Sequence, residues 1–338
     1  MSFKAGVLGA SGYAGAELLR LCAGHPELDV VVAGAGSHAG EAVATRTPSL
    51  AAAYPSLVYG GIDAAALDGL DVAFLALPHG ESQRLVPDLV ARVGVVVDLA
   101  ADFRLADASC YPSWYGTEHA APELLATFVY GLPELYRDEL RGARRVAVPG
   151  CYPTAVALAL GPFARAGAIG GPVVVDAASG ASGAGRAASD RLHFCTVDED
   201  FTAYGLLTHR HTPEMEQVLG TTVLFTPHLA PMTRGILATC YATPARRITT
   251  ADALGLLREA YAHERFVVVT DEPPSTRATA GSNCAHVTVR VDDRTGWLVA
   301  LCAIDNLVKG AAGQAIQCAN LALGTDEGTG LPLAGMSP

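Results

Sequence analysis

The sequence predicts an α/β protein with two domains, a doubly wound parallel sheet followed by an α+β domain with a mostly antiparallel sheet. A buried strand, a glycine-rich turn and a helix follow one another over residues 3–22. Strands and helices then alternate as far as residue 148, which is typical of a parallel sheet. Beyond residue 151 the predicted strands have fewer helices between them, and residues 292–296 have the composition of a hairpin turn. The predicted domains are residues 1–150, completed by a C-terminal helical segment at 309–338, and residues 151–308.

The composition is that of a globular chain and disfavours several classes of partner. With 338 residues and 50% hydrophobic content, the chain can bury a large core. Its 34 acidic and 23 basic residues give a net charge of -11 without a basic run, which argues against nucleic acid or an anionic membrane as a partner. No stretch approaches the roughly 20 apolar residues of a membrane helix, and the first residues lack a long apolar core, so we expect no signal peptide.

The cysteines indicate a reducing compartment. All 8 are dispersed along the chain, and their spacing fits neither a zinc knuckle nor a redox pair. We therefore expect reduced thiols, no metal site and a cytoplasmic location.

The first glycine turn predicts a dinucleotide site. It follows a clear strand, and its spacing is Gly-x-x-Gly-x-x-Gly rather than Gly-x-Gly-x-x-Gly. Glycines there would let a pyrophosphate approach the N-terminus of the next helix, although they could also serve only to pack strand against helix. The predicted cofactor contacts are Gly9, Ala10, Ser11, Gly12, Tyr13, Ala14 and Gly15.

The end of the second strand favours NADP over NAD. Residues 34–38 carry no acid where an NAD enzyme usually holds the ribose 2′-hydroxyl. Ser37 and the neighbouring backbone can instead donate hydrogen bonds to a 2′-phosphate. The alternative is a polar turn without a ligand.

Two later strand ends in the first domain carry further candidates. Leu77, Pro78 and His79 end one strand and would lie near the nicotinamide, although His79 could equally be a solvated loop residue. Arg104 follows the next strand and could hold a phosphate through its fork of donors. Its alternative is a surface ion pair with Asp102 or Asp107.

The stretch Pro149-Gly150-Cys151-Tyr152-Pro153-Thr154 connects a strand to an apolar helix, and we interpret Cys151 as the nucleophile. Pro153 suits the first turn of a helix, and Gly150 permits the bend before it. A thiol at a helix N-terminus forms a thiolate more easily, because the unpaired N–H groups favour an anion. The alternative is a small buried core cysteine without reactivity.

Two loops of the second domain complete the predicted site. In the segment 208–214, Thr212 is expected to cap a helix that ends at Gly220, and His211 precedes that cap. Glu214 lies three residues on and could fix the tautomer of His211, making the histidine a catalytic acid/base. Residues 179–186 form a glycine-rich loop that could approach a cofactor or an anionic substrate, or could be a flexible connection.

These motifs together resemble the N-acetyl-gamma-glutamyl-phosphate reductase family. The likeness is carried by residues 146–155 and 161–162, the Gly9 to Gly15 turn, Asp102-Phe103-Arg104, Ser179 to Arg186, His209 to Glu214 and Asp305 to Gly310, and it covers nearly the whole chain. It implies a Rossmann-type NADP domain, a second domain of the semialdehyde-dehydrogenase type and a cytoplasmic homotetramer.

The resemblance also implies the reaction and several contacts. NADPH would reduce N-acetyl-L-glutamyl 5-phosphate to the 5-semialdehyde through a Cys151 thioester, with release of inorganic phosphate, in arginine biosynthesis. His211 would be the acid/base, supported by Glu214, and Asn306 would lie near the nicotinamide amide. Ser182 and Gly183 join the expected cofactor contacts. The expected substrate contacts are Arg104, Tyr152, Ser179, Gly180, Tyr204 and His209.

Three other hypotheses stay open at this point. The same chemistry could act on a carrier-linked aminoadipyl or glutamyl phosphate. Aspartyl phosphate is a weaker candidate, because the aspartate enzymes lack Pro-Gly-Cys-Tyr-Pro-Thr. A non-catalytic NADP-binding redox sensor would need a thiolate but no proton shuttle, so the pair of His211 and Glu214 argues against it.

Overall fold

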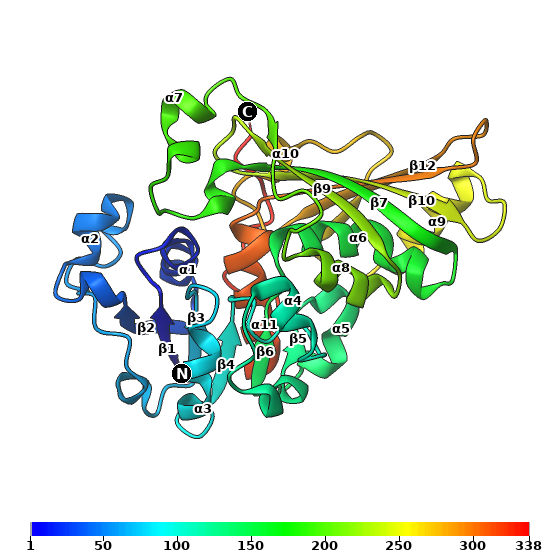
Figure 1. Cartoon of the computed structure of the whole chain (residues 1–338). Helices are drawn as coiled ribbons and strands as arrows, with labels where there is room; N and C mark the ends of the chain where they lie inside the picture. Colours follow the sequence, from blue (N-terminus) through cyan, green and yellow to red (C-terminus); the bar gives the residue numbers. More distant parts are fainter. Residues whose placement is uncertain (1, 338) are drawn as a thin grey trace. The chain divides into compact units, whose positions relative to one another are not determined.

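A computed structural model describes residues 2–337, and the chain forms two compact units (Figure 1). Unit 1 comprises the residues up to Pro149 together with Ala311–Leu331. Unit 2 comprises Gly150–Gly310 and the segment from Pro332 onward.

Unit 1 contains a six-stranded sheet in the order β2-β1-β3-β4-β6-β5, and every neighbouring pair is parallel. The predicted parallel, doubly wound sheet is confirmed. Its apolar strands are largely buried, as expected for a sheet covered by helices. The strands are β1 (Phe3–Leu8), β2 (Leu28–Gly34), β3 (Val72–Leu75), β4 (Val95–Asp98), β5 (Val129–Tyr130) and β6 (Arg145–Ala147).

The helices of unit 1 pack mainly on this sheet. Helix α1 lies against β1 and β2, and α11 lies against β4 and α5. Helix α11 is preceded by a π-helical turn at Val308–Ala312. The helices are α1 (Tyr13–Ala23), α2 (Val43–Arg46), α3 (Ser82–Leu89), α4 (Cys110–Tyr115), α5 (Pro133–Leu140) and α11 (Gly313–Leu323).

The C-terminal segment corrects one prediction. The predicted block at 309–338 is divided, because α11 belongs to unit 1 and the segment from Pro332 belongs to unit 2. The Cys284 thiol donates to the Leu333 carbonyl at 3.2 Å, and the Met336 amide donates to the Ala280 carbonyl at 2.8 Å. These bonds bind the segment along residues 280–284, a pairing that the glycine-rich tail sequence did not indicate.

Unit 2 contains a seven-stranded sheet in the order β11-β12-β13-β10-β7-β9-β8. The pairs β12–β13, β13–β10, β10–β7 and β9–β8 are antiparallel, whereas β11–β12 and β7–β9 are parallel. The prediction of a mostly antiparallel sheet is confirmed, and residues 292–296 form the turn between β12 and β13. The strands are β7 (Ile169–Gly180), β8 (Thr202–Ala203), β9 (Val223–Ala230), β10 (Ile236–Pro244), β11 (Val267–Val269), β12 (Ala285–Val291) and β13 (Leu298–Ile304).

Helix α6 is the central helix of unit 2. Its residues from Tyr152 to Phe163 are all buried, because the helix is apolar on every side. Helices α6, α8 and α9 cover one face of the sheet (Figure 1). The helices are α6 (Cys151–Arg165), α7 (Phe194–Val197), α8 (Thr212–Leu219), α9 (Thr250–Ala260) and α10 (Thr276–Thr279).

Two features are absent from residues 2–337. Over that range we find no helix with the length and apolar character needed to cross a membrane. The same residues contain no group of three or more His, Cys, Asp or Glu side chains arranged to hold a metal ion.

Candidate active site

Cys151 is the first residue of α6, immediately after the turn that follows β6. Gly150 caps the helix with extended backbone angles, makes no side-chain cap bond, and is followed by no acid in the first turn. The amides of this turn therefore favour a negative charge on the Cys151 sulfur. The predicted position of the cysteine at a helix N-terminus is confirmed.

The exposure of Cys151 distinguishes it from the core cysteines. Cys151 is half-buried, whereas Cys22, Cys240, Cys284, Cys302 and Cys318 are buried. Burial raises the pKa of Cys22 to about 12, which keeps that thiol protonated and inert. Cys151 is therefore not a fully buried core cysteine.

The imidazole of His211 lies directly against the residue before Cys151. A Cβ atom placed on Gly150 would be 2.5 Å from His211 Nε2, which is closer than real atoms approach. Gly150 is therefore needed for space as well as for the bend. The predicted pairing of Cys151 and His211 in one site is supported by this contact.

Glu214 is fully buried in the first turn of α8, and its Oε1 accepts the Gly150 amide at 2.9 Å. It thus braces the turn that carries Cys151. Its predicted contact with the His211 imidazole stays a prediction.

The start of α8 corrects the predicted cap. Thr212 is the first helical residue, and His211 occupies the capping position without a side-chain cap bond. Pro213 still falls within the first turn, where proline is tolerated, and Gly220 ends the helix in the left-handed conformation as predicted.

An aromatic cluster adjoins this pair and contains three of the predicted substrate contacts. The rings of Tyr152, Tyr204 and His209 pack edge to face with centroids 5.6 Å apart for the two pairs that include His209. The Tyr152 and Tyr204 hydroxyls are 3.1 Å apart, and the Tyr152 hydroxyl also donates to the His228 carbonyl at 3.1 Å. Burial raises the pKa of Tyr204 to about 12, so its hydroxyl remains protonated at neutral pH.

The glycine-rich loop after β7 is held by Asn306. The Asn306 amide nitrogen donates to the Ser182 hydroxyl at 3.0 Å, and its oxygen accepts the Gly235 amide at 2.7 Å. The Ser179 hydroxyl donates to the Gly180 carbonyl at 3.1 Å, and a Cβ on Gly183 would lie 2.9 Å from that hydroxyl. The predicted residues of this loop and Asn306 are therefore brought together.

Sequence reasoning gave no role to two structural elements of the site. The loop at 231–235 backs the glycine-rich loop, because the Ala181 amide donates to the Met232 carbonyl at 2.9 Å and the Ser182 amide donates to the Thr233 carbonyl at 3.2 Å. A Cβ on Gly310 would lie 2.8 Å from the Cys151 Cβ. Gly310 thus leaves room beside the nucleophile. In the sequence it stood out only as the last residue of the Asp305 to Gly310 motif.

The glycine turn of unit 1 fits a pyrophosphate. Gly9 has φ +77°, and a Cβ there would be 2.1 Å from the Ala76 carbonyl oxygen. A Cβ on Gly15 would be 2.2 Å from the Gly9 carbonyl oxygen. Gly12 caps the 11-residue helix α1 without a side-chain bond, and the first turn contains no acid, so its amides suit an anionic ligand.

Ser37 is exposed in a 3₁₀ turn at Gly36–His38, directly after β2. Because β2 is the parallel neighbour of β1, this turn and the glycine turn lie at the same edge of the sheet. The acid next along the chain, Glu41, pairs with His38 through Nδ1 at 3.1 Å. This placement agrees with the proposed 2′-phosphate contact.

His79 and Asp102 form a buried pair in unit 1. His79 Nδ1 is 2.6 Å from Asp102 Oδ1, and the imidazole is only 18% exposed, so His79 is not a solvated loop residue. Asp102 also accepts the amides of Gly80 and Gln83. Burial opposes ionisation of Asp102, but the bonds from His79 and the two amides prevail and lower its pKa. The predicted contact of His79 with cofactor stays a prediction.

Arg104 is buried, which overturns the alternative of a surface ion pair. Its Nε donates to the Val148 carbonyl at 2.7 Å, and one terminal nitrogen donates to the Leu99 carbonyl at 2.6 Å. The guanidinium thus joins the segments that follow β4 and β6. Its predicted phosphate contact stays a prediction.

Comparisons with known proteins give the family of this chain. Residues 4–143 match the semialdehyde dehydrogenase NAD binding domain, and residues 151–306 match the semialdehyde dehydrogenase dimerisation domain. An N-acetyl-gamma-glutamyl-phosphate reductase of Symbiobacterium thermophilum is 49% identical over 99% of both chains. One of Pseudomonas putida is 45% identical, again over 99% of both. The chain belongs to the N-acetyl-gamma-glutamyl-phosphate reductase family.

The fold is shared with solved semialdehyde dehydrogenases. An aspartate semialdehyde dehydrogenase with NADP from Candida albicans has a TM-score of 0.72 at 17% identity, covering 96% of this chain and 99% of that one. A Vibrio cholerae enzyme has a TM-score of 0.71 at 16% identity, covering 96% and 98%. This confirms the predicted fold.

Proposed function

We propose that this member of the reductase family is an NADP(H)-dependent oxidoreductase of arginine biosynthesis. It converts N-acetyl-L-glutamyl 5-phosphate into N-acetyl-L-glutamate 5-semialdehyde and inorganic phosphate, the third step from glutamate. The observation that carries the proposal is the placement of Cys151 at the N-terminus of α6 with the His211 imidazole against Gly150. The named relatives, matched over 99% of the chain, support the substrate.

The first half of the reaction is acyl transfer to sulfur. His211 accepts the thiol proton, and the Cys151 thiolate attacks the acyl carbon of the substrate. The carbon–sulfur bond forms, the carbon–oxygen bond to phosphate breaks with its electron pair, and inorganic phosphate leaves. Amides in the first turn of α6 stabilise the oxyanion that forms in between. A thioester on Cys151 results.

The second half releases the aldehyde. NADPH, when bound, supplies the hydride that reduces the thioester carbonyl. His211 gives a proton to the resulting oxyanion and takes it back as the carbon–sulfur bond breaks. Cys151 leaves as a thiolate, so the sulfur is ready for another turnover. A thiol suits both halves, because it attacks well and leaves well.

Unit 1 supplies most of the residues that would bind NADP(H). The amides at the start of α1 would hold the pyrophosphate, and Gly9 and Gly15 keep that turn compact. Ser37 would donate to the 2′-phosphate. Leu77, Pro78 and His79 follow β3, the parallel neighbour of β1, at the edge of the sheet where dinucleotides bind in this architecture.

A substrate panel tests the proposed function. NADPH oxidation is followed with acetylglutamyl, aspartyl and carrier-linked acyl phosphates, using the unmodified protein and Cys151→Ser. We expect turnover with acetylglutamyl phosphate alone, and a loss of roughly a thousandfold or more in the variant with NADPH binding retained. Normal turnover by Cys151→Ser would refute the nucleophile, and preference for another acyl phosphate would refute the substrate.

The proposal also covers the oligomeric state and the cellular location of the protein. We expect a cytoplasmic homotetramer, supported by the match of residues 151–306 to a dimerisation domain and by the 8 cysteines, which form no disulfide within the described residues. Light scattering of the purified protein measures the assembly, and a mass other than that of four chains would refute it.

A further inference from the structure

His209 accepts hydrogen bonds from two successive backbone amides at the start of α8. Its ring nitrogen Nδ1 accepts the His211 amide at 3.1 Å, and its carbonyl accepts the Thr212 amide at 3.0 Å. A side chain that accepts the amide two residues further along the chain forms the same hydrogen bond as in an Asx turn. The backbone that carries His211 is therefore fixed by the residue two places before it.

The ring of His209 is itself held from several sides. Edge-to-face contacts place its centroid 5.6 Å from Tyr152, 5.3 Å from Phe225 and 4.8 Å from His211. A Cβ on Gly205 would lie 3.6 Å from its Cδ2, an ordinary van der Waals distance, so Gly205 lies close beside the ring. These contacts fix the orientation in which Nδ1 faces the His211 amide.

The hydrogen bond also defines the tautomer of His209. Because Nδ1 accepts an N–H, that nitrogen carries no proton, and the proton of the neutral ring is on Nε2. Burial, with a further effect from the Arg210 charge, lowers the pKa of His209 to about 4. The other titratable groups that face the ring are Tyr152, Tyr204 and His211. Protonation would turn Nδ1 into a donor facing a donor and break the bond.

The Arg210 side chain differs from the His209 ring in its exposure. It lies between the two histidines in the sequence, and its side chain is exposed. In this turn the rings of His209 and His211 pack against each other, whereas the Arg210 side chain between them in the sequence is exposed.

We propose that His209 is a positioning residue for His211. Its Nδ1 fixes the His211 backbone, and so holds the His211 imidazole against Gly150 beside the nucleophile. This deepens the proposed function and rests on it, because it takes His211 as the acid/base. It assigns His209 a role distinct from a direct contact with substrate through Nε2 and from simple ring packing.

Two substitutions separate these roles. In His209→Asn the amide oxygen can accept the His211 N–H while the ring is lost. In His209→Phe the ring is kept while the acceptor is lost. We expect His209→Phe to lower kcat by tenfold to a hundredfold with KM changed less than about twofold, since small displacements of a catalytic group have effects of this size. His209→Asn should recover most of the lost kcat.

A second readout needs no substrate. The rate of alkylation of the Cys151 peptide by iodoacetamide, followed by mass spectrometry across pH, reports on the thiolate beside His211. We expect the profile of His209→Phe to shift and that of His209→Asn to return toward the unmodified protein. The readout remains valid if the substrate panel rejects acetylglutamyl phosphate, so the two proposals fail separately.

Three results would overturn the proposal. Unchanged kcat and an unchanged alkylation profile in His209→Phe would show that the ring only packs. A raised KM in both variants with unchanged alkylation would show a substrate contact. Equal loss of kcat in both variants, with melting temperatures within a few degrees of the unmodified protein, would show that the acceptor is not what matters.

Discussion

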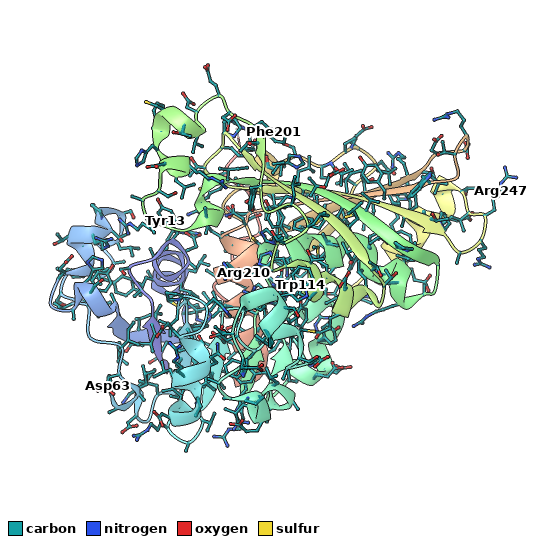
Figure 2. The ribbon with its side chains drawn as sticks, in the orientation of Figure 1. Tyr13, Asp63, Trp114, Phe201, Arg210 and Arg247 are labelled. Atoms are coloured by element: carbon teal, nitrogen blue, oxygen red, sulfur yellow. The ribbon has the colours of Figure 1, made fainter. Side chains whose placement is uncertain are left out.

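The starts of α1 and α6 use the same local structure for different purposes. Each helix follows a parallel strand through a glycine cap, without a side-chain cap bond and without an acid in the first turn. At α1 the first helical residue is Tyr13, and the amides suit an anion brought by a ligand (Figure 2). At α6 the first residue is Cys151, and the same amides favour an anion of the protein itself.

The glycines of the two turns differ in what they make room for. Gly9 and Gly15 make room for backbone carbonyl oxygens within unit 1, so they keep one turn compact. Gly150 makes room for the His211 ring, which comes from a segment about 60 residues further along the chain. Both turns therefore pack against a distant segment, at the Ala76 carbonyl for Gly9 and at the His211 ring for Gly150, but only the second partner is a group that can move protons.

The largest effect is expected for His211→Gln. If His211 moves the protons, kcat should fall by about a hundredfold to ten-thousandfold. NADPH affinity, measured by fluorescence, should be unchanged, because the α1 turn lies in the other unit. A loss of less than threefold in kcat would remove the distinction between the two turns.

Gly150→Ala is expected to have the next largest effect. Its Cβ would meet His211 Nε2 at 2.5 Å, so the imidazole must shift and kcat should fall by about a hundredfold. The matched control is Gly255→Ala in α9, where a Cβ meets nothing within 4 Å. That control should keep its activity and gain helix stability of about 0.5–1 kcal/mol. Equal kcat values for the two variants would contradict the contact.

Asp98→Asn should alter the pH dependence of stability. Burial, with a further effect from Asp102, raises the pKa of Asp98 to about 8, and Ser82 donates to its Oδ1 at 2.7 Å. The folded state therefore binds this proton up to a pH near 8, whereas the unfolded state releases it near pH 4, so stability falls as pH rises between these values. The variant cannot ionise, so its urea unfolding should lack that slope. An unchanged slope would show that Asp98 is ionised in the folded protein.

The smallest effect is expected for Ser37→Asp. A carboxylate after β2 would repel a 2′-phosphate and hold a 2′-hydroxyl, so the preference for NADPH over NADH should narrow by about tenfold. Fluorescence titrations with NADPH and with NADH give the two affinities, and their ratio measures this preference. The iodoacetamide reactivity of Cys151 should not change, because the substitution lies in unit 1. Equal affinities of the unmodified protein for both cofactors would refute the assignment of Ser37.

The sequence predicted local features better than distant pairings. Strand, glycine and helix N-terminus are set within a few residues, so the local order of residues predicted the turns at Gly9 and Cys151. The bond from Glu214 to the Gly150 amide and the packing of Gly310 on Cys151 connect segments far apart in the chain, and no local pattern indicates them. For the same reason the sequence left a surface ion pair open as an alternative for Arg104, since its Nε acceptor, the Val148 carbonyl, lies 44 residues away.

Phosphate-free reverse turnover tests the central claim most directly. N-acetyl-glutamate semialdehyde and NADP are mixed with the enzyme without phosphate, so the reaction should stop at the acyl-enzyme. The account predicts a burst of one NADPH per chain and one acyl group on the peptide that contains Cys151. A burst without an adduct, or an adduct on another cysteine such as the exposed Cys195, would contradict it.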